Sequence, residues 1–354
     1  MSHGVTKLLL IDINILGIGA MREYEYRDRR HRGKATGAMH GTLDKLASLM
    51  EDHADHLPLV LWDDRCRWRE AILPQYKRHR WETPEQQAFL ESYLAQAAVV
   101  RQLLGHLGVP QVFCPDFEAD DLAGVICRGA DPAWQITLAT SDTDWYQVLR
   151  KNVTWRSPRT GKIVRESDLA NVELIEEGPF HSTDHYVCAK ALAGDTADGI
   201  PGVKGVGLKT AARIIRDHGS VEALWARHDA GEAIKGVALQ RAAGPACRAD
   251  YFRNLRLIDW RLAPPLRDDF ALELHEPEFA AFAKLCGDWD LSGADEAWRG
   301  FSSPWKEAHS VVAHIHDMLS RAAAASDRIT PAPAAWGQDS FRPPRHPARG
   351  RERS

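Results

Sequence analysis

Short apolar runs alternate with helical patterns along the first half of the chain. Runs of four or five large apolar residues predict buried strands, and apolar positions spaced three or four apart predict helices between them. Strands that alternate with helices favour a largely parallel sheet. The predicted strands are Lys7–Ile11, Leu59–Trp62, Gln111–Cys114 and Gln135–Ala139, and the predicted helices are Thr42–His53 and Pro84–Leu107.

From about residue 180 the strand-like runs end and helical periodicity dominates. A glycine-rich turn, GIPGVKGVG (199–207), joins the first two predicted helices of this part, and Ser220 is placed to cap the third. We therefore expect an α/β unit over residues 1–180, a helical unit over 181–300 and a C-terminal helix over 301–325. The predicted helices are Ser182–Ala193, Leu208–His218, Val221–His228, 232–256, 276–285 and 304–325.

Residues 326–354 differ in composition from the rest of the chain. They contain five prolines, six arginines and little apolar content, which predicts a disordered tail. Its arginines suit weak contacts with nucleic acid, and a solvated tail without a specific role explains them equally well.

Composition excludes several classes of protein. The chain has 354 residues, 44% of them hydrophobic and 27% charged, which is typical of a folded globular protein. Its six cysteines include no C-x-x-C pair, which favours reduced thiols in a cytoplasmic protein. The first apolar run ends at Asp12, which favours a strand over a signal peptide, and no run reaches the ~18 apolar residues of a membrane span. We expect a monomer without membrane contact.

Acidic residues stand at or just after the apolar runs in five places. The carboxyl ends of parallel strands meet at one rim of a sheet, so these side chains are expected to converge there. Like charges that converge repel each other and require hard divalent cations, and two such ions can hydrolyse phosphodiesters. Any one cluster could be a helix cap or a partner of a helix dipole, but five together favour metals. The nine residues are Asp12, Asp63, Glu118, Asp120, Asp121, Asp142, Asp144, Asp195 and Asp198.

Positive charge gathers in two segments beside these acids. Residues 65–81 carry six basic side chains and only one acid, Glu70, and they begin directly after Asp63. In the glycine-rich turn, Gly202, Gly205 and Gly207 allow backbone amides to approach a phosphate, and the next helix begins there. Such a turn can bind the phosphate backbone of a duplex without reading its bases. A solvated surface is the alternative for the first segment, and also for a third basic cluster at 27–34.

Several motifs occur in an order that resembles one family. GDTADGIPGVKGVGLKTA (194–211) resembles the GDxxDNIPGVxGxGxKTA signature of the 5′-nucleases, which include the 5′–3′ exonuclease domain of bacterial DNA polymerase I, phage exonucleases and flap endonucleases. EADDLAGVI, SDTDWYQVL, and VLWDD followed by YKRHR match further blocks. The resemblance covers roughly residues 5–260. It implies a PIN-like, mostly parallel α/β sheet with a helical arch at about 65–105, followed by an all-α helix–three-turn–helix DNA-binding subdomain.

The resemblance also implies roles for individual residues. The first metal ion would be held by Asp12, Asp63, Glu118, Asp120 and Asp121, and the second by Asp142, Asp144, Asp195 and Asp198. Two Mg²⁺ ions are expected, with Mn²⁺ as a substitute. Lys77 would contact the scissile phosphate, assisted by Arg80, while Tyr76 would stack on a base or belong to the arch core. By analogy the turn could hold K⁺. The implied DNA-binding residues are Arg69, Tyr76, Gly202, Lys204, Gly205, Gly207, Lys209, Thr210 and Arg213.

The implied activity is a 5′–3′ exonuclease and flap endonuclease that acts on DNA with a 5′ end, nick or flap, in replication, primer removal or repair. Removal of RNA from RNA–DNA hybrids and a non-catalytic DNA-binding relative are the alternatives. A non-catalytic relative would lack carboxylates or Lys77, and none is missing. The chain departs from the family pattern at Ile13, Gly19 and Gly199, and Arg22 could replace an arginine expected at position 19.

Overall fold

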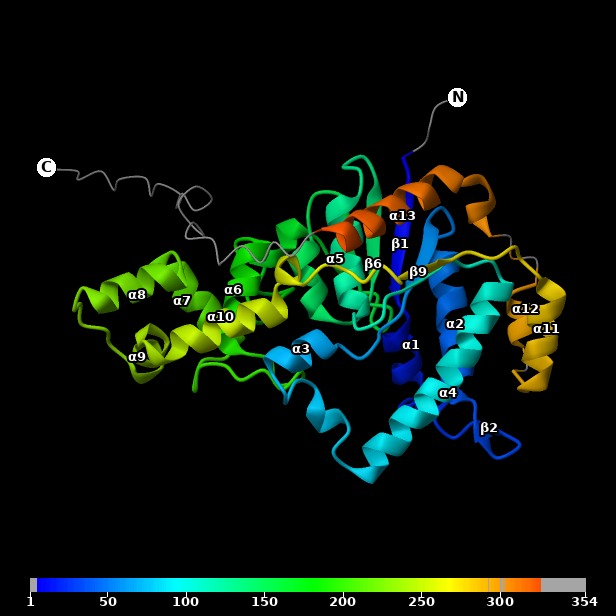
Figure 1. The fold of residues 1–354 in the computed structure, drawn as a ribbon, viewed down its shortest axis with the longest axis horizontal. Helices are drawn as coiled ribbons and strands as arrows, with labels where there is room; N and C mark the ends of the chain where they lie inside the picture. Colours follow the sequence, from blue (N-terminus) through cyan, green and yellow to red (C-terminus); the bar gives the residue numbers. More distant parts are fainter. Residues whose placement is uncertain (1–4, 292, 300, 302, 326–354) are drawn as a thin grey trace, which may run out of the picture.

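The computed structural model describes residues 5–291, 293–299, 301 and 303–325. A seven-stranded sheet lies at its centre, in the order β8-β7-β6-β1-β4-β5-β9 (Figure 1). The five central strands run parallel, and the edge strands β8 and β9 are antiparallel to their neighbours. The strands are β1 (Lys7–Asp12), β4 (Leu57–Leu61), β5 (Gln111–Phe113), β6 (Gln135–Ala139), β7 (Val153–Arg156), β8 (Ile163–Val164) and β9 (Ala271–Glu273), with a separate hairpin of β2 (Arg30–His31) and β3 (Lys34–Ala35).

Helices cover both faces of the sheet, as expected for a parallel sheet. Alternate residues of β1 point to opposite faces, so Leu8 packs with α5 and α13, whereas Leu9 packs with α2 and α4. The helices are α1 (Ile13–Ala20), α2 (Gly37–Asp52), α3 (Arg67–Ile72), α4 (Pro84–His106), α5 (Ala119–Gly129), α6 (Thr183–Ala193), α7 (Leu208–His218), α8 (Val221–Asp229), α9 (Val237–Ala243), α10 (Ala246–Ile258), α11 (Phe279–Asp288), α12 (Ala294–Ala297) and α13 (His309–Ala324).

The four predicted strands are confirmed to within two residues at either end, but the five further strands and helices such as α1 and α12 were not predicted. Helix α1 begins directly after Asp12, whose side chain accepts a hydrogen bond from the Ile15 amide. Strands β7 and β8 follow the predicted set. Strand β9 pairs Glu273 with Gln111, so the expectation of no strand beyond residue 180 is wrong. Three residues are too few to show a period in the sequence.

The helical unit runs from α6 to α10 and lies beside the sheet (Figure 1). The side chains of Ser182 and Ser220 cap α6 and α8 by accepting hydrogen bonds from backbone amides, as the sequence suggests. The helix predicted over 232–256 is instead two helices, because Gly244 and Pro245 separate α9 from α10. Proline lacks the amide that a continuous helix requires.

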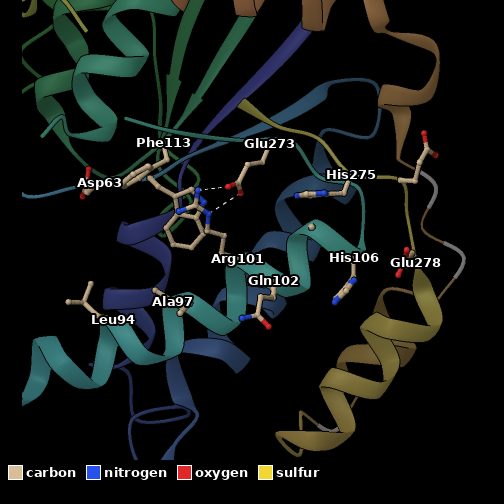
Figure 2. A pocket seen from close by; sticks show the side chains of 14 residues that line it. Asp63, Leu94, Ala97, Arg101, Gln102, His106, Phe113, Glu273, His275 and Glu278 are labelled. Atoms are coloured by element: carbon tan, nitrogen blue, oxygen red, sulfur yellow. Dashed lines mark hydrogen bonds and ion pairs between the residues drawn. The ribbon is translucent and has the colours of Figure 1, made fainter. Parts of the chain in front are cut away.

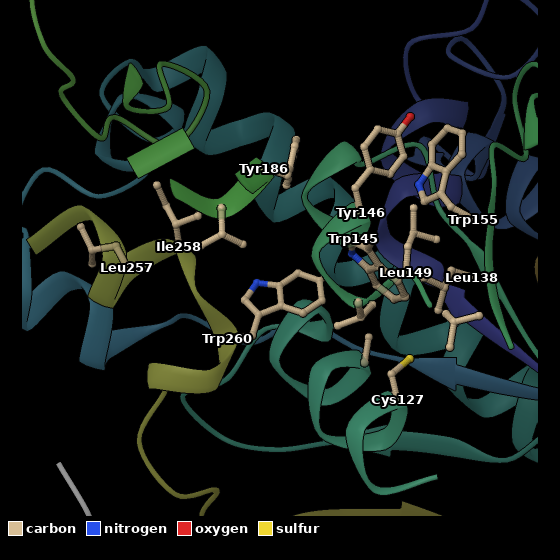
Figure 3. Packing of buried hydrophobic residues seen from close by; sticks show 14 of the residues in the cluster. Cys127, Leu138, Trp145, Tyr146, Leu149, Trp155, Tyr186, Leu257, Ile258 and Trp260 are labelled. Atoms are coloured by element: carbon tan, nitrogen blue, oxygen red, sulfur yellow. The ribbon is translucent and has the colours of Figure 1, made fainter. Parts of the chain in front are cut away.

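Aromatic side chains join the helical unit to the sheet. Trp145 follows β6 and Trp260 follows α10, and their rings meet edge to face at 6.0 Å (Figure 3). Tyr186 of α6 packs against Tyr146 at 5.7 Å between ring centroids. These large rings are buried, so the two parts of the chain share one hydrophobic cluster.

The last part of the described chain returns to the sheet. Helix α11 packs on α4, α12 on α2 and α13 on α5. The C-terminal helix predicted over 304–325 is a short 3₁₀ turn, Pro304–Glu307, followed by α13. Among the residues that the structure describes, no helix combines the length and apolar character needed to span a bilayer. The tail predicted to be disordered, 326–354, lies outside the described residues.

Candidate active site

The carboxyl ends of three central strands meet at one rim, as the sequence predicts. Asp12 closes β1, Asp63 follows β4 by two residues, and Asp142 follows β6 by three. The Thr140 hydroxyl donates to Asp12 across the rim at 2.9 Å. Desolvation and the neighbouring Asp63 carboxylate raise the pKa of Asp12 to about 8. The rim thus brings together acids that are more than 100 residues apart.

Helix α5 adds acids from its first turn. The backbone amide of Ala119 donates to Asp63 at 2.7 Å, which holds the start of α5 against the end of β4. Desolvation and the Asp142 charge raise the pKa of Asp120 well above its usual value, although Trp145 donates its indole N–H to it at 2.7 Å. Desolvation and Asp144 raise the pKa of Asp142 to about 7. Protein groups alone therefore leave negative charge at this rim under-compensated.

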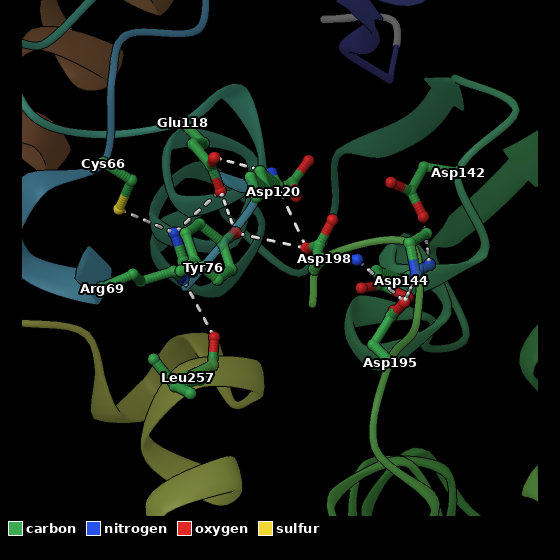
Figure 4. Close-up of polar contacts among 12 residues, drawn as sticks. Cys66, Arg69, Tyr76, Glu118, Asp120, Asp142, Asp144, Asp195, Asp198 and Leu257 are labelled. Atoms are coloured by element: carbon green, nitrogen blue, oxygen red, sulfur yellow. Dashed lines mark hydrogen bonds and ion pairs between the residues drawn. The ribbon is translucent and has the colours of Figure 1, made fainter. Parts of the chain in front are cut away.

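A second set of acids joins the two units of the chain (Figure 4). Asp144 comes from the turn after β6, whereas Asp195 and Asp198 come from the turn after α6. One carboxylate oxygen from each lies within 4.8 Å of the others, a spacing that suits a cation. The ligand atoms of all three side chains are hard carboxylate oxygens, which Mg²⁺ and Mn²⁺ prefer. The residues present fit a divalent ion at this rim.

Lys190 lies among the second set of acids and was not predicted. Its ammonium group forms ion pairs with Asp144 and, at 2.6 Å, with Asp195. Burial disfavours the charged lysine, yet Asp144 keeps the pKa of Lys190 well above its usual value. Lys190 lies in the last turn of α6, five residues before Asp195, and nothing local in the sequence shows that it turns towards the acids.

Lys77 and Arg80 face the acids from the arch segment (residues 65–105). The Lys77 ammonium contacts Glu118 at 2.6 Å and Asp198 at 3.7 Å, and Arg80 contacts Asp198 at 2.8 Å. The Lys77 amide also donates to the Asp198 carbonyl at 2.8 Å. Gly199 has φ +71°, and a Cβ there would lie 2.9 Å from the Gln75 carbonyl oxygen, so glycine suits this close approach. The structure therefore brings both predicted catalytic cations to the carboxylates.

Arg69 and Tyr76 were expected to contact DNA, but the structure buries both. The Arg69 side chain is 2% exposed, and its guanidinium binds Glu118 at 3.0 Å and Asp121 at 2.7 Å. The Tyr76 hydroxyl donates to Glu118 at 2.8 Å, so the ring belongs to the arch core. Both oxygens of Asp121 are taken by Arg69, which turns Asp121 away from the rim. This geometry does not support direct DNA contact by Arg69 or Tyr76, nor metal ligation by Asp121.

The glycine-rich turn presents an open surface at the start of α7. Lys204, Lys209 and Arg213 are exposed, and Thr210 is half-buried. Gly207 precedes α7, and a Cβ there would meet nothing within 4 Å. At two of the predicted DNA-binding glycines, the fold itself requires glycine for another reason. Gly205 has φ +85°, and a Cβ on Gly202 would lie 1.8 Å from the Ala193 carbonyl oxygen. The exposed amides and cations suit an anion at this helix N-terminus.

A cavity of 690 Å³ opens beside Asp63, between α4 and the segment that follows β9 (Figure 2). Its polar wall contains Arg101, which pairs with Glu273 at 2.6 Å. His106, His275 and Glu278 line its far end. Arg22, the substitute considered for position 19, lies with its guanidinium 5.6 Å from the Phe89 ring of α4.

Comparison with known proteins agrees with this geometry. The family model for the 5′–3′ exonuclease N-terminal resolvase-like domain matches residues 7–176, and that for the 5′–3′ exonuclease C-terminal SAM fold matches residues 182–259. The chain therefore belongs to the 5′–3′ exonuclease family. Its fold is the PIN-like, mostly parallel sheet of that family, followed by a helical SAM-fold domain.

Individual relatives differ in how much of them the chain covers. DNA polymerase I of Mycobacterium tuberculosis is 31% identical over 255 residues, which are 71% of this chain and 27% of that protein. Thermostable DNA polymerase I of Thermus filiformis is 28% identical over 285 residues, 77% of this chain and 32% of that protein. The chain thus spans less than a third of the length of these relatives.

Solved structures share the fold. The 5′-exonuclease of bacteriophage T5 with bound zinc has a TM-score of 0.58 and 23% identity, over 72% of this chain and 89% of that one. The T5 flap endonuclease in a pseudo-enzyme-product complex with DNA and metal ions has a TM-score of 0.58 and 21% identity, over 88% and 99%. Flap endonuclease-1 of Methanococcus jannaschii has a TM-score of 0.51 and 20% identity, over 90% and 93%.

Proposed function

We propose that this chain is a divalent-metal-dependent 5′–3′ exonuclease and flap endonuclease that hydrolyses phosphodiester bonds near DNA 5′ ends. The observation that carries the proposal is the cluster of Asp144, Asp195 and Asp198, where the sheet and the helical unit together supply one set of hard oxygen ligands. The family of the chain, and the DNA in the T5 flap endonuclease complex, support DNA as the substrate class. Replication, primer removal and repair are the processes that need such cuts.

Two Mg²⁺ ions, replaceable by Mn²⁺, would activate water and stabilise the charge that develops on the phosphate. Asp12, Asp63, Glu118 and Asp120 would hold the first ion, and the remaining rim acids the second. The buried pair of Arg69 and Asp121 keeps Glu118 in place without itself facing the rim.

The cations of the chain have two tasks in this proposal. Lys77 and Arg80 lie within 4 Å of rim acids and would turn to the scissile phosphate once metal ions neutralise those acids. Lys204, Lys209 and Arg213 would hold the duplex backbone at the glycine-rich turn, with its amides. The turn is also where a K⁺ ion would bind. We propose that the protein acts as a monomer in the cytoplasm.

The test compares 5′-flap, nicked, blunt and RNA–DNA hybrid duplexes in Mg²⁺, in Mn²⁺ and in EDTA. We expect cleavage of at least one DNA substrate with either metal and none in EDTA. The hybrid shows whether RNA removal is a main activity. No cleavage of any substrate with either metal would overturn the proposal.

A further inference from the structure

Residues 254–260, which form the last turn of α10 and the two residues after it, contact each part of the candidate site. Their first contact is with the helical hairpin that carries the glycine-rich turn. Asn254 is 1% exposed, and its amide nitrogen donates to the carbonyl of Ala191 at 2.9 Å and to that of Pro201 at 2.8 Å. Both hydrogens of this amide are thus used, one on α6 and one inside the glycine-rich turn.

The second contact reaches the first carboxylate group through the arch. The Leu257 carbonyl accepts a hydrogen bond from Arg69 Nε at 2.9 Å (Figure 4). The remaining nitrogens of the same guanidinium hold Glu118 and Asp121. A planar guanidinium fixes the relative positions of all its partners, so α10, α3 and α5 are held as one unit.

The third contact reaches the second carboxylate group. Gln147 lies three residues after Asp144, and its amide nitrogen donates to the carbonyls of Asp144 at 3.0 Å and Ile258 at 3.2 Å. Its amide oxygen accepts from the Trp260 backbone at 3.0 Å. Trp260 in turn packs on Trp145, which donates to Asp120. One half-buried glutamine thereby joins the end of α10 to the loop of Asp142 and Asp144.

We propose that residues 254–260 couple duplex binding at the glycine-rich turn to metal binding at the rim, with Arg69, Gln147 and Asn254 as positioning residues. The inference rests on the proposed function, which assigns DNA to the turn and metal ions to the carboxylates. A duplex that fixes the turn also fixes Asn254, and the hydrogen bonds that the Leu257 and Ile258 carbonyls accept carry that restraint to Glu118 and Asp144. By thermodynamic linkage, duplex then tightens metal binding and metal tightens duplex binding by the same factor.

The experiment measures Mn²⁺ affinity from the electron paramagnetic resonance signal of free Mn²⁺, with and without a closed dumbbell duplex. A dumbbell has no 5′ end for an exonuclease to attack, and a dumbbell-only sample corrects for Mn²⁺ bound by DNA. For the unaltered protein we expect the duplex to tighten Mn²⁺ binding by about fivefold or more. In Gln147→Met and Arg69→Lys we expect this factor to fall below about twofold, while Mn²⁺ affinity without DNA changes less.

Arg101→Lys is the matched control, because it breaks a two-point arginine–carboxylate pair with Glu273 far from α10. This control should keep the coupling factor of the unaltered protein. Asn254→Ser offers a third variant, which removes the amide that bonds Ala191 and Pro201, and circular dichroism confirms that each variant is folded. We call Gln147→Met, Arg69→Lys and Asn254→Ser the junction variants. The inference is overturned if the folded junction variants keep the full coupling factor, or if Arg101→Lys loses as much of it as they do.

The two proposals fail separately. If the unaltered protein cuts DNA but its Mn²⁺ affinity is the same with and without the duplex, the coupling is absent and the proposed function stands. If it cuts nothing but shows the factor, and the junction variants lose it, the coupling stands and the proposed function fails.

Discussion

The two carboxylate groups of the rim are built in different ways. The first (Asp12, Asp63, Glu118 and Asp120) comes from strand ends and from α5, all within the sheet unit. The second (Asp142, Asp144, Asp195 and Asp198) is complete only when the helical unit lies against the sheet. The first group follows from the topology of one unit, whereas the second depends on an interface. Disturbing that interface should therefore affect the second group before the first.

The largest effect should come from removing a carboxylate of either group. We expect Asp63→Asn and Asp195→Asn each to lower the cleavage rate by at least about 1,000-fold, or about 4 kcal/mol, because each removes charge that would hold a metal ion in the proposed function. Rates on a 5′-flap duplex measure the loss. Asp64→Asn is the matched control, since Asp64 adjoins Asp63 but its carboxylate accepts a hydrogen bond from the Asp116 amide. Equal losses in Asp63→Asn and Asp64→Asn would refute the assignment of the rim.

Lys77→Ala tests the cation that touches both groups. We expect turnover to fall about 100-fold with much less change in DNA affinity, because Lys77 would act on the charge that develops at the phosphate. Single-turnover rates and binding isotherms separate the two quantities. Lys45→Ala, which loses a half-buried pair with Glu23 and a contact with the Tyr26 ring, should leave both unchanged. An unchanged turnover in Lys77→Ala would remove the role assigned to Lys77.

Raised pKa values predict a pH-dependent stability in the absence of metal ions. Desolvation and nearby acids raise the pKa of Asp12 to about 8 and that of Asp142 to about 7, from 3.8. A raised folded-state pKa gives stability that is present below pH 4 and lost as pH rises towards 8. In EDTA we expect the free energy of unfolding to fall by about 1 kcal/mol or more between pH 5 and pH 8.

Mg²⁺ should reverse this loss, because bound cations favour the deprotonated acids. Thermal unfolding in EDTA and in Mg²⁺ at pH 5, 6, 7 and 8 measures it, and the gain from Mg²⁺ should be larger at pH 8 than at pH 5. Asp12→Asn should show a smaller pH dependence in EDTA than the unaltered protein. A gain from Mg²⁺ that is equal at all pH values would contradict the charge crowding.

The smallest effect should come from single cations of the glycine-rich turn. We expect Lys209→Ala or Arg213→Ala to weaken duplex binding a few-fold and to lower the slope of affinity against salt by about one, because each removes one phosphate contact. Turnover of bound substrate should stay constant. Arg227→Ala, a change on α8 that loses surface contacts with Glu232 and His218, should keep the original slope. Equal slopes in all variants would place the duplex elsewhere.

Much of the fold and of the site could be predicted from the sequence. The strands before Asp12 and Asp63 are apolar runs, and the strand before Asp142 is short and mostly apolar, so all three can be predicted without knowledge of their neighbours. The glycine-rich turn and the spacing of Asp195 and Asp198 are equally local. Strand β9 could not be predicted, because its three residues become a strand only by pairing with β5.

The tertiary structure decided how the charges are paired. As sequence, Arg69 is one member of a basic run, and Asp121 is one acid among three in a first turn. Folding places Arg69 against Asp121. It also places Arg69 against the Leu257 carbonyl, which is 188 residues away along the chain. Lys190 likewise acquires its carboxylate partners only when α6 meets the loop after β6. The sequence alone indicated that the acids after the strands, Asp12, Asp63 and Asp142, gather at the rim, because strand ends are local features. The fold added Asp195 and Asp198 and turned Asp121 away. Which cations balance them was decided by packing between distant segments.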